Sequence, residues 1–142
     1  MQITPIKNIT PAIVEDIKAL IKQLTEPRCD ITIDSLNAII NLGESELLVA
    51  KDENDKIVGS MCLMVYTIPS TKKAFIEDVV VSAEARGKGY GKAMIEKAIE
   101  MAKAKGVKYI ELSSNPKRIA ANALYKKLGF KVRETNYYRM EI

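Results

Sequence analysis

Histidine is absent from the sequence, and this absence restricts the chemistry of the chain more than any other feature of its composition. Ser-His-Asp and Cys-His catalytic arrangements, histidine-ligated zinc and histidine proton shuttles all need an imidazole. Any acid or base must therefore be an aspartate, glutamate, lysine, tyrosine or cysteine. The two cysteines, Cys29 and Cys62, form no C-x-x-C pair, so we expect reduced thiols and no metal site.

The sequence also lacks a run of about 18 apolar residues, and its first residues lack the basic and apolar regions of a signal peptide. We therefore expect a cytoplasmic protein that does not bind membranes. The net charge is only +4, and aromatic residues do not alternate with a basic stripe, so we expect no nucleic-acid partner. The 142 residues, 47% hydrophobic and 28% charged, fit one globular domain over 1–142.

Hydrophobic periodicity and punctuating residues predict an alternation of strands and helices. Thr10 and Pro11 suit the start of a first helix that Pro27 stops, and Asn115 with Pro116 suits the cap and start of the last helix. Helices are expected at 11–26, 32–42, 89–105 and 115–128, and strands at 1–9, 47–51, 57–67, 75–82, 107–112, 130–132 and 137–140. This order describes an α/β chain with an antiparallel, hairpin-built half and a βαβ crossover half.

The most informative segment is 79–92, where an apolar strand passes through a glycine-rich turn into a helix. Unbonded N–H groups at a helix N-terminus attract anions, and glycines let a pyrophosphate approach the backbone closely. Arg86, Lys88 and Lys92 add mobile positive charge. The segment suits a phosphate ligand, and an exposed charged turn is the alternative.

The glycine spacing excludes two common nucleotide-binding loops. A Walker A loop needs a glycine five positions before Gly91 and a Ser or Thr after Lys92, and the chain has neither. A Rossmann fingerprint that began at Gly87 would need a glycine at Lys92. One that began at Gly89 would need a glycine at Met94.

Two motifs stand in a fixed order along the chain: R-x-x-G-x-G over residues 86–91 and A-x-x-L-Y-x-x-x-G-F over residues 121–130. Together they resemble the acetyl-CoA pyrophosphate loop and a later helix signature of the GNAT N-acetyltransferase superfamily. The resemblance covers residues 57–142 well and the first two helices only in outline. It implies the GNAT acyl-CoA N-acyltransferase fold, a mixed, mostly antiparallel twisted sheet flanked by helices, with strands splayed at the cofactor site.

The resemblance also implies how acetyl-CoA, the acyl-donor cosubstrate, would bind. Its pantetheine arm would lie between the strands 75–82 and 107–112, where the main chains of Val79 and Val81 would bind the amides while their side chains pack in the core. Many members carry asparagine at the position of Arg118, so we expect Arg118 to reach a CoA phosphate or an anionic acceptor instead. The residues implied in cofactor binding are Val79, Val80, Val81, Arg86, Gly87, Lys88, Gly89, Tyr90, Gly91, Lys92, Arg118, Asn122, Tyr125 and Lys126.

Acetyl transfer to an amine needs a neutral nucleophile and a proton for the departing thiolate. Tyr125 matches the superfamily tyrosine that commonly donates this proton, and core packing is its alternative role. Glu77 and Asp78 are adjacent, so strand alternation sends them to opposite faces. Because Glu77 shares its parity with Val79 and Val81, we expect it to face the cleft and accept the proton of the amine, directly or through water. The alternative for Glu77 is a structural ion pair, and an acyl intermediate on Cys62 is not expected.

The function implied by the resemblance is acetyl transfer to a primary amine of a small molecule, by direct attack in a ternary complex. A protein or peptide N-acetyltransferase and a non-catalytic acyl-CoA-binding sensor domain are the alternatives. The acceptor would be selected by the first two helices, the loop 25–32 and the strand ends near Tyr66 and 136–138. Dimers are common in the superfamily, and a homodimer is one of the oligomeric states that the resemblance leaves open.

Overall fold

The computed structural model describes residues 1–24 and 30–142. Within these residues one sheet has the strand order β1-β2-β3-β4-β5. Its first four strands are antiparallel, and β5 runs parallel to β4. The sheet is therefore mixed and mostly antiparallel, as predicted. The strands are β1 (Gln2–Pro5), β2 (Glu46–Lys51), β3 (Ile57–Ile68), β4 (Thr71–Val81) and β5 (Tyr109–Leu112).

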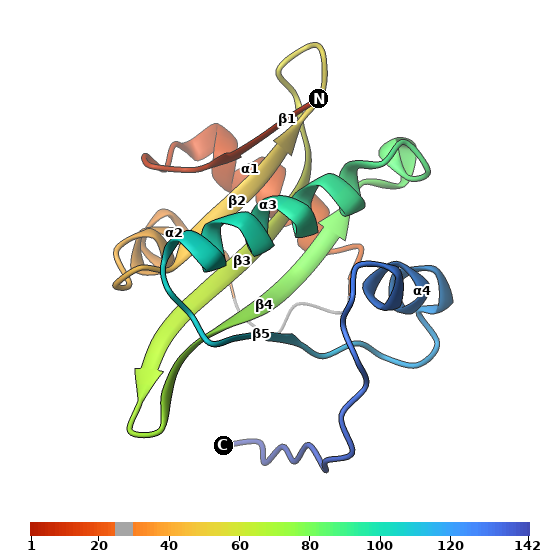
Figure 1. Cartoon of the computed structure of the whole chain (residues 1–142). Coiled ribbons are helices and arrows are strands. Elements are labelled where there is room, and N and C mark those ends of the chain that lie inside the picture. The colour runs from red at the N-terminus through yellow and green to blue at the C-terminus, as the bar shows by residue number, and fades with distance from the viewer. Residues whose placement is uncertain (25–29) are drawn as a thin grey trace.

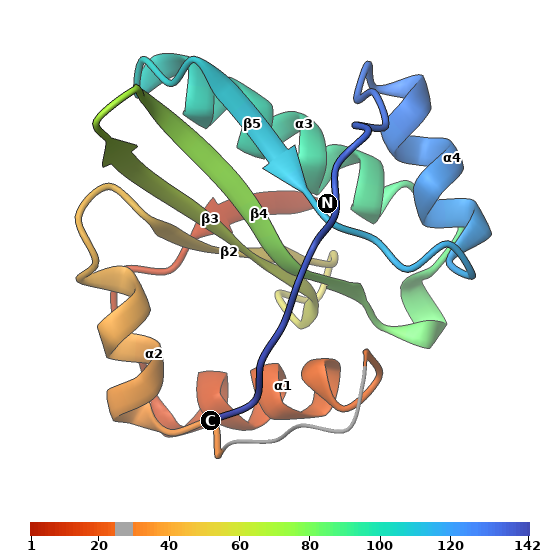
Figure 2. The same cartoon turned by 90° about the horizontal axis from the view of Figure 1, so that it is seen from below.

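Helices cover both faces of the sheet (Figures 1 and 2). The helices α1 (Pro11–Ile21) and α2 (Ile33–Ile40) lie on one face, and α3 (Tyr90–Ala104) lies on the other. The helix α4 (Ile119–Lys127) lies beside the end of β4, beyond the end of β5. The core is accordingly divided into two clusters of buried side chains. One lies against α3 and also contains Tyr125, and the other lies against α1 and α2.

The N-termini of α1 and α2 are fixed by the threonines that precede them. Thr10 Oγ1 accepts the Ile13 N–H at 3.3 Å, which confirms the predicted cap. Thr32 and Ser35 form a reciprocal capping box, with bonds of 3.1 and 2.9 Å. Each such cap contributes about 1 kcal/mol. The first helix ends at Ile21, and the predicted stop at Pro27 lies outside the described residues.

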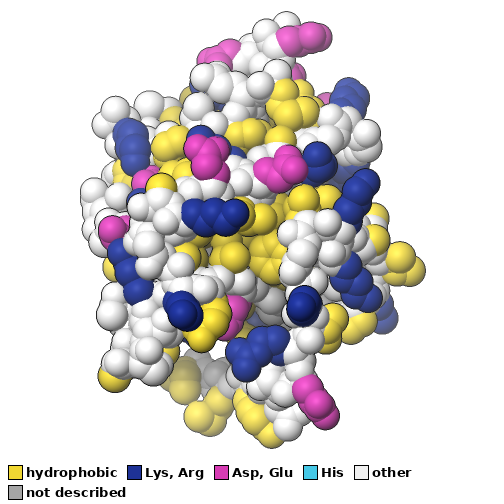
Figure 3. All heavy atoms as spheres, in the orientation of Figure 1, with side chains coloured by type: hydrophobic (Ala, Val, Ile, Leu, Met, Phe, Trp, Pro, Cys, Tyr) yellow, Lys and Arg dark blue, Asp and Glu magenta, His cyan; other side chains and the backbone are white. Residues whose placement is uncertain are grey.

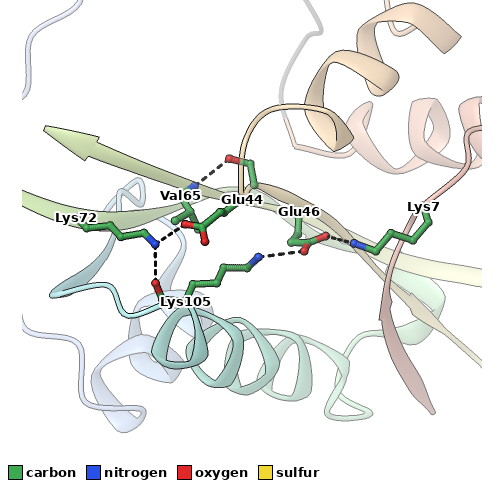
Figure 4. A network of polar contacts seen from close by, with 7 residues as sticks. Lys7, Glu44, Glu46, Val65, Lys72 and Lys105 are labelled. Atoms are coloured by element: carbon green, nitrogen blue, oxygen red, sulfur yellow. Dashed lines mark hydrogen bonds and ion pairs between the residues drawn. The ribbon is translucent and has the colours of Figure 1, made fainter.

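A network of ion pairs anchors the end of the sheet where α3 finishes (Figure 4). Glu46 accepts from Lys7 at 2.8 Å and from Lys105 at 3.2 Å. Lys72 pairs with Glu44 and donates to the Lys105 carbonyl at 2.7 Å. The network joins the segment after β1, the α2–β2 connection and β4 to the C-terminus of α3. It lies at the opposite end of α3 from the glycine-rich turn, about 22 Å away for a helix of 15 residues.

The start of the last helix differs from the prediction. Helix α4 begins at Ile119 with Arg118 as its N-cap residue. Asn115 does not cap it, because the Asn115 Oδ1 accepts the Lys117 N–H at 2.9 Å and the Asn115 carbonyl accepts the Arg118 N–H at 2.9 Å. These bonds form a separate turn before the helix, which is a common competing use of an asparagine side chain.

The two terminal strands expected at 130–132 and 137–140 are not formed. The described chain has no helix or strand after residue 127. Arg133 reaches Glu111 of β5 at 3.6 Å, but no backbone ladder follows. Val132 is 84% exposed and Tyr138 is 85% exposed, so the segment has no buried face that would hold it in the sheet.

Candidate active site

The glycine-rich turn leaves the N-terminus of α3 open. Gly87 and Gly89 have φ values of +75° and +86°, in the left-handed region that other residues enter only with strain. A Cβ at Gly87 would meet nothing within 4 Å, and one at Gly89 would meet only the Met1 Cε at 3.9 Å. Within the described residues no side chain caps α3. The turn therefore offers helix N–H groups and open space to an anion.

Arg86 is held in place instead of projecting from the rim as a mobile charge. Its Nε donates to the Val81 carbonyl at 3.2 Å, and one Nη donates to the Gln23 Oε1 at 3.4 Å. Gln23, two residues after the end of α1, also accepts the Ala83 N–H at 3.1 Å through the same oxygen. Gln23 was missed by sequence reasoning, because nothing local signals a contact with a residue sixty positions later. Lys88 and Lys92 remain exposed near the turn.

The edge of β4 is open where the cofactor was expected. Pairing between β4 and β5 ends at Ile76 and Leu112, although β4 continues to Val81. Beyond that point the Val79 carbonyl accepts from Arg118 at 3.3 Å, and the Val81 carbonyl accepts from Arg86. The two valines that were predicted to bind pantetheine through their main chains thus present backbone groups to side chains and not to a neighbouring strand.

A bulge in β4 overturns the parity argument for Glu77. Val80 lies opposite Ser60, but Glu77 lies opposite Cys62, so β4 contains one extra residue between these pairs. Asp78 adopts a left-handed φ of +52° there. The extra residue shifts the alternation of side chains by one position. As a result, Ile76, Val79 and Val81 all pack toward α3.

Glu77 therefore shares its face with its partner Cys62 and with Val80, toward α1 and α2, and not with Val79 and Val81 as predicted. The side chain is exposed. Partial burial raises the pKa of Glu77, the charge of Asp78 raises it further, and Arg139 opposes the shift. Among the residues described, no Lys or Arg nitrogen lies within 4 Å of its carboxylate, which leaves the structural ion pair without support.

Cys62 is not suited to nucleophilic catalysis. Burial, followed by the charges of Asp78 and Glu77, raises the pKa of its thiol to about 12. Because the thiolate is the reactive form, Cys62 stays protonated at neutral pH. This agrees with the expectation that it carries no acyl group.

Tyr125 is buried, with 6% of its surface exposed, and packs edge-to-face on Phe130 with 6.1 Å between ring centroids. Burial raises the pKa of its hydroxyl, and the charge of Arg118 opposes that increase. The Asn122 amide nitrogen donates to the carbonyls of Asn115 and Arg118 at 2.9 Å each, which joins α4 to the turn that precedes it. Apolar side chains are visible between α3 and α4 on this face of the molecule, and both basic and acidic side chains border them (Figure 3).

Residues 15–130 match the family described as the Acetyltransferase (GNAT) family. The chain belongs to this family. The fold and the acetyltransferase class that the two motifs implied are thereby confirmed. Of the described helices, none is long and apolar enough to cross a membrane. Nor do three His, Cys, Asp or Glu side chains gather as a metal site in the part of the chain that the structure describes.

This GNAT chain is similar to curated acetyltransferases. It is 33% identical over 130 residues to the L-2,4-diaminobutyric acid acetyltransferase of Shouchella clausii, covering 89% of this chain and 70% of that protein. It is 39% identical over 82 residues to the glucosamine 6-phosphate N-acetyltransferase of Trypanosoma brucei brucei, covering 56% and 54%. Its match spans only 37% of an uncharacterized N-acetyltransferase of Methanocaldococcus jannaschii.

Solved structures share the whole fold. An aminoglycoside N-acetyltransferase crystallised in complex with CoA superposes with a TM-score of 0.75 at 18% identity, covering 99% of this chain and 100% of that one. At this identity the likeness establishes the fold alone.

Proposed function

We propose that this GNAT chain transfers the acetyl group of acetyl-CoA to a primary amine of a small molecule, by direct attack in a ternary complex. The observation that carries the proposal is the open edge of β4 beyond Ile76, which leads to the uncapped N-terminus of α3. The names of two relatives support a small acceptor, since they specify diaminobutyric acid and glucosamine 6-phosphate.

The residues present fit acetyl-CoA. The turn with Gly87 and Gly89 would hold the pyrophosphate through main-chain N–H groups, and exposed Lys88 and Lys92 would add charge. The backbone of β4 would hold the pantetheine amides, and the Val79 carbonyl, which has two lone pairs, would accept from Arg118 and from the cofactor together. When bound, acetyl-CoA supplies an acetyl group activated as a thioester.

Proton transfer is assigned to two residues on opposite sides of β4. Glu77 would accept the proton of the incoming ammonium, directly or through water, and its raised pKa brings a carboxylate closer to the range of an efficient general base. Tyr125 would hold the proton for the departing sulfur from the α3 side. The bulge at Asp78 separates the two residues onto different faces of the sheet.

The test is direct. The purified protein is titrated with acetyl-CoA by calorimetry and then assayed for free thiol release with a panel of small amines, including diamino acids and amino sugar phosphates. Acetyl-CoA binding with amine-dependent thiol release supports the proposal. Acetyl-CoA binding with thiol release only on peptides or proteins would favour the protein acetyltransferase. Acetyl-CoA binding without any thiol release, together with a biological effect that Tyr125→Phe leaves intact, would favour the sensor domain.

We further propose a single domain over 1–142 that acts in the cytoplasm, and a homodimer as its assembly. The dimer is supported by the exposed large hydrophobic side chains of the segment 130–142.

A further inference from the structure

Arg118 is held by its backbone on both sides, and its side chain crosses to β4. Its N–H donates to the Asn115 carbonyl, and its own carbonyl accepts the N–H of Asn122, each at 2.9 Å. The Asn122 side chain donates to that same carbonyl, also at 2.9 Å. From this fixed position one Nη reaches the Val79 carbonyl at 3.3 Å. The side chain thus bridges α4 to the open edge of β4.

The bridge lies on the same side of α4 as Tyr125, away from the pyrophosphate turn. Arg118 and Tyr125 are seven residues apart, which places them two turns apart on the same side of α4. Val79 lies two residues before Val81, or about 6.6 Å further from the turn along the strand. Arg86 already occupies the Val81 carbonyl on the side of the turn. The two arginines therefore divide the open edge of β4 between them.

We propose that Arg118 is a positioning residue of the acetyl-transfer site, which keeps a permanent positive charge beside Tyr125 and the thioester end of acetyl-CoA and does not bind the CoA phosphates. The inference rests on the proposed function. It gives Arg118 neither of the two roles expected from the sequence, which were a contact with a CoA phosphate and a contact with an anionic acceptor.

The chemistry explains why a charge is needed there. An ordinary thiol has a pKa near 8.5 and an ordinary tyrosine near 10, so proton transfer from a phenol to a thiolate is already unfavourable by about 1.5 units, or roughly 30-fold. Burial of Tyr125 raises its pKa and increases this barrier. A guanidinium stays protonated throughout and stabilises negative charge on either atom. As the C–S bond breaks, the electron pair stays on sulfur, the proton passes from the Tyr125 oxygen to sulfur, and Arg118 keeps its own proton.

Arg118 is the charged group that acts on Tyr125 among the described residues. Phe130 packs edge-to-face on the ring. Replacing Arg118 therefore changes the electrostatic environment of Tyr125 without removing a cap, because its side chain makes no capping bond to α4.

The test compares Arg118→Gln, Arg118→Lys and Lys117→Gln, the last removing one exposed positive charge from the adjacent residue. Tyr125 ionisation is followed by ultraviolet titration of the protein without acetyl-CoA, as the difference between each variant and the same variant with Tyr125→Phe. We expect Arg118→Gln to raise the pKa of Tyr125, Arg118→Lys to restore it, and Lys117→Gln to leave it unchanged.

Calorimetry and kinetics complete the test. We expect acetyl-CoA affinity to change less than about threefold in Arg118→Gln, and kcat at neutral pH to fall at least about tenfold, as for loss of a group that stabilises developing charge. A large loss of acetyl-CoA affinity with unchanged Tyr125 ionisation would assign Arg118 to a phosphate and overturn the inference. If Arg118→Gln changes neither the ionisation of Tyr125 nor kcat, and the wild-type protein is active, this role of Arg118 is overturned and the proposed function stands. A wild-type protein that binds no acetyl-CoA would overturn the proposed function and this role together. If Arg118→Gln does not fold, as judged by circular dichroism, Arg118→Met takes its place.

Discussion

The side-chain oxygen of Gln23 accepts the Ala83 N–H at 3.1 Å and an Arg86 Nη at 3.4 Å, so the end of α1 holds the segment that leads into the glycine-rich turn. The Gln23 nitrogen donates to the Ala19 carbonyl at 3.4 Å, which fixes the orientation of the amide. The helix expected to select the acceptor is thereby joined to the turn expected to bind the cofactor.

Replacing Gln23 should weaken acetyl-CoA binding from a distance. Gln23→Leu removes the acceptor of two hydrogen bonds, and the loss of about 1 kcal/mol of loop ordering corresponds to roughly a fivefold higher Kd. Gln23→Glu keeps the acceptor and gains a charge-assisted bond to Arg86, so its Kd should stay near the wild-type value. Calorimetry measures both, with Lys22→Leu as the neighbouring control. Equal acetyl-CoA affinity in Gln23→Leu and Gln23→Glu would contradict a link between Gln23 and the glycine-rich turn.

Gly89→Val should abolish tight acetyl-CoA binding. The substitution forces a β-branched residue into a left-handed φ and places a side chain in the open space at the turn. Gly106→Val is the matched control, because Gly106 has a φ of +72°, meets nothing within 4 Å and lies at the other end of α3. Both variants should lose about 1–3 kcal/mol of stability from strain, measured by urea unfolding. Only Gly89→Val should raise the Kd, by more than about tenfold, and equal binding losses would remove the turn from the cofactor site.

Tyr125→Phe separates packing from proton donation. The ring can keep its contact with Phe130 while the hydroxyl is lost. We expect kcat to fall by about 10²–10⁴, the usual range for a general acid, with acetyl-CoA affinity nearly intact. A variant that turns over at the wild-type rate on an identified amine would leave Tyr125 with a packing role.

Glu77 should control the acidic limb of the pH–rate profile. Its pKa is raised by burial and then by Asp78, so activity should decline at a higher pH than for an ordinary glutamate. Glu77→Gln should lower kcat/KM and remove this limb. Asp78→Asn, which suits the left-handed backbone, should lower the pKa of Glu77 and move the limb to lower pH. An unaltered profile in both variants would exclude Glu77 as the base.

The stability of Glu77→Gln distinguishes this role from a structural one. A carboxyl with a raised pKa stabilises the fold only in its protonated form, so its contribution is present at low pH and is lost as pH rises through the folded pKa. At neutral pH the substitution should therefore leave the free energy of unfolding unchanged or slightly higher. A marked loss of stability at pH 7 would indicate an ion pair instead.

The C-terminal segment should promote self-association. Tyr138 is 85% exposed and Met140 is 80% exposed, which is costly for large apolar groups in water. Sedimentation velocity should show a dimer in the wild-type protein, and the double substitution Tyr138→Ser and Met140→Ser should shift it toward monomer. A monomer at all concentrations would contradict the proposed homodimer.

Features encoded within a few residues were predicted from the sequence, and features that depend on distant contacts were not. The glycine-rich turn before α3 and the cap at Thr10 are local, since a short spacing determines their backbone. The face of Glu77 was wrong because the bulge is defined by register with β3, which alternation along β4 alone does not reveal. The prediction of Asn115 as a cap was wrong because Asn-Pro also suits a turn, and here the turn from Asn115 to Arg118 ends immediately before the helix. The role of Gln23 depends on a contact across sixty residues.

The extra residue at the bulge in β4 places Glu77 and Val79 on opposite faces of the sheet. The proposed amine acceptor and acetyl-CoA would then contact β4 from different faces. Without the extra residue, the side chain of Glu77 would point the same way as those of Val79 and Val81, and the proposed acceptor and donor would compete for a single face of the sheet. With it, the proposed amine would approach from the side of α1 and α2, while Tyr125 packs on the side of α3. Under the proposed function, substitutions in α1 and α2 would change which amine is accepted and would leave the acetyl-CoA side of the sheet unchanged.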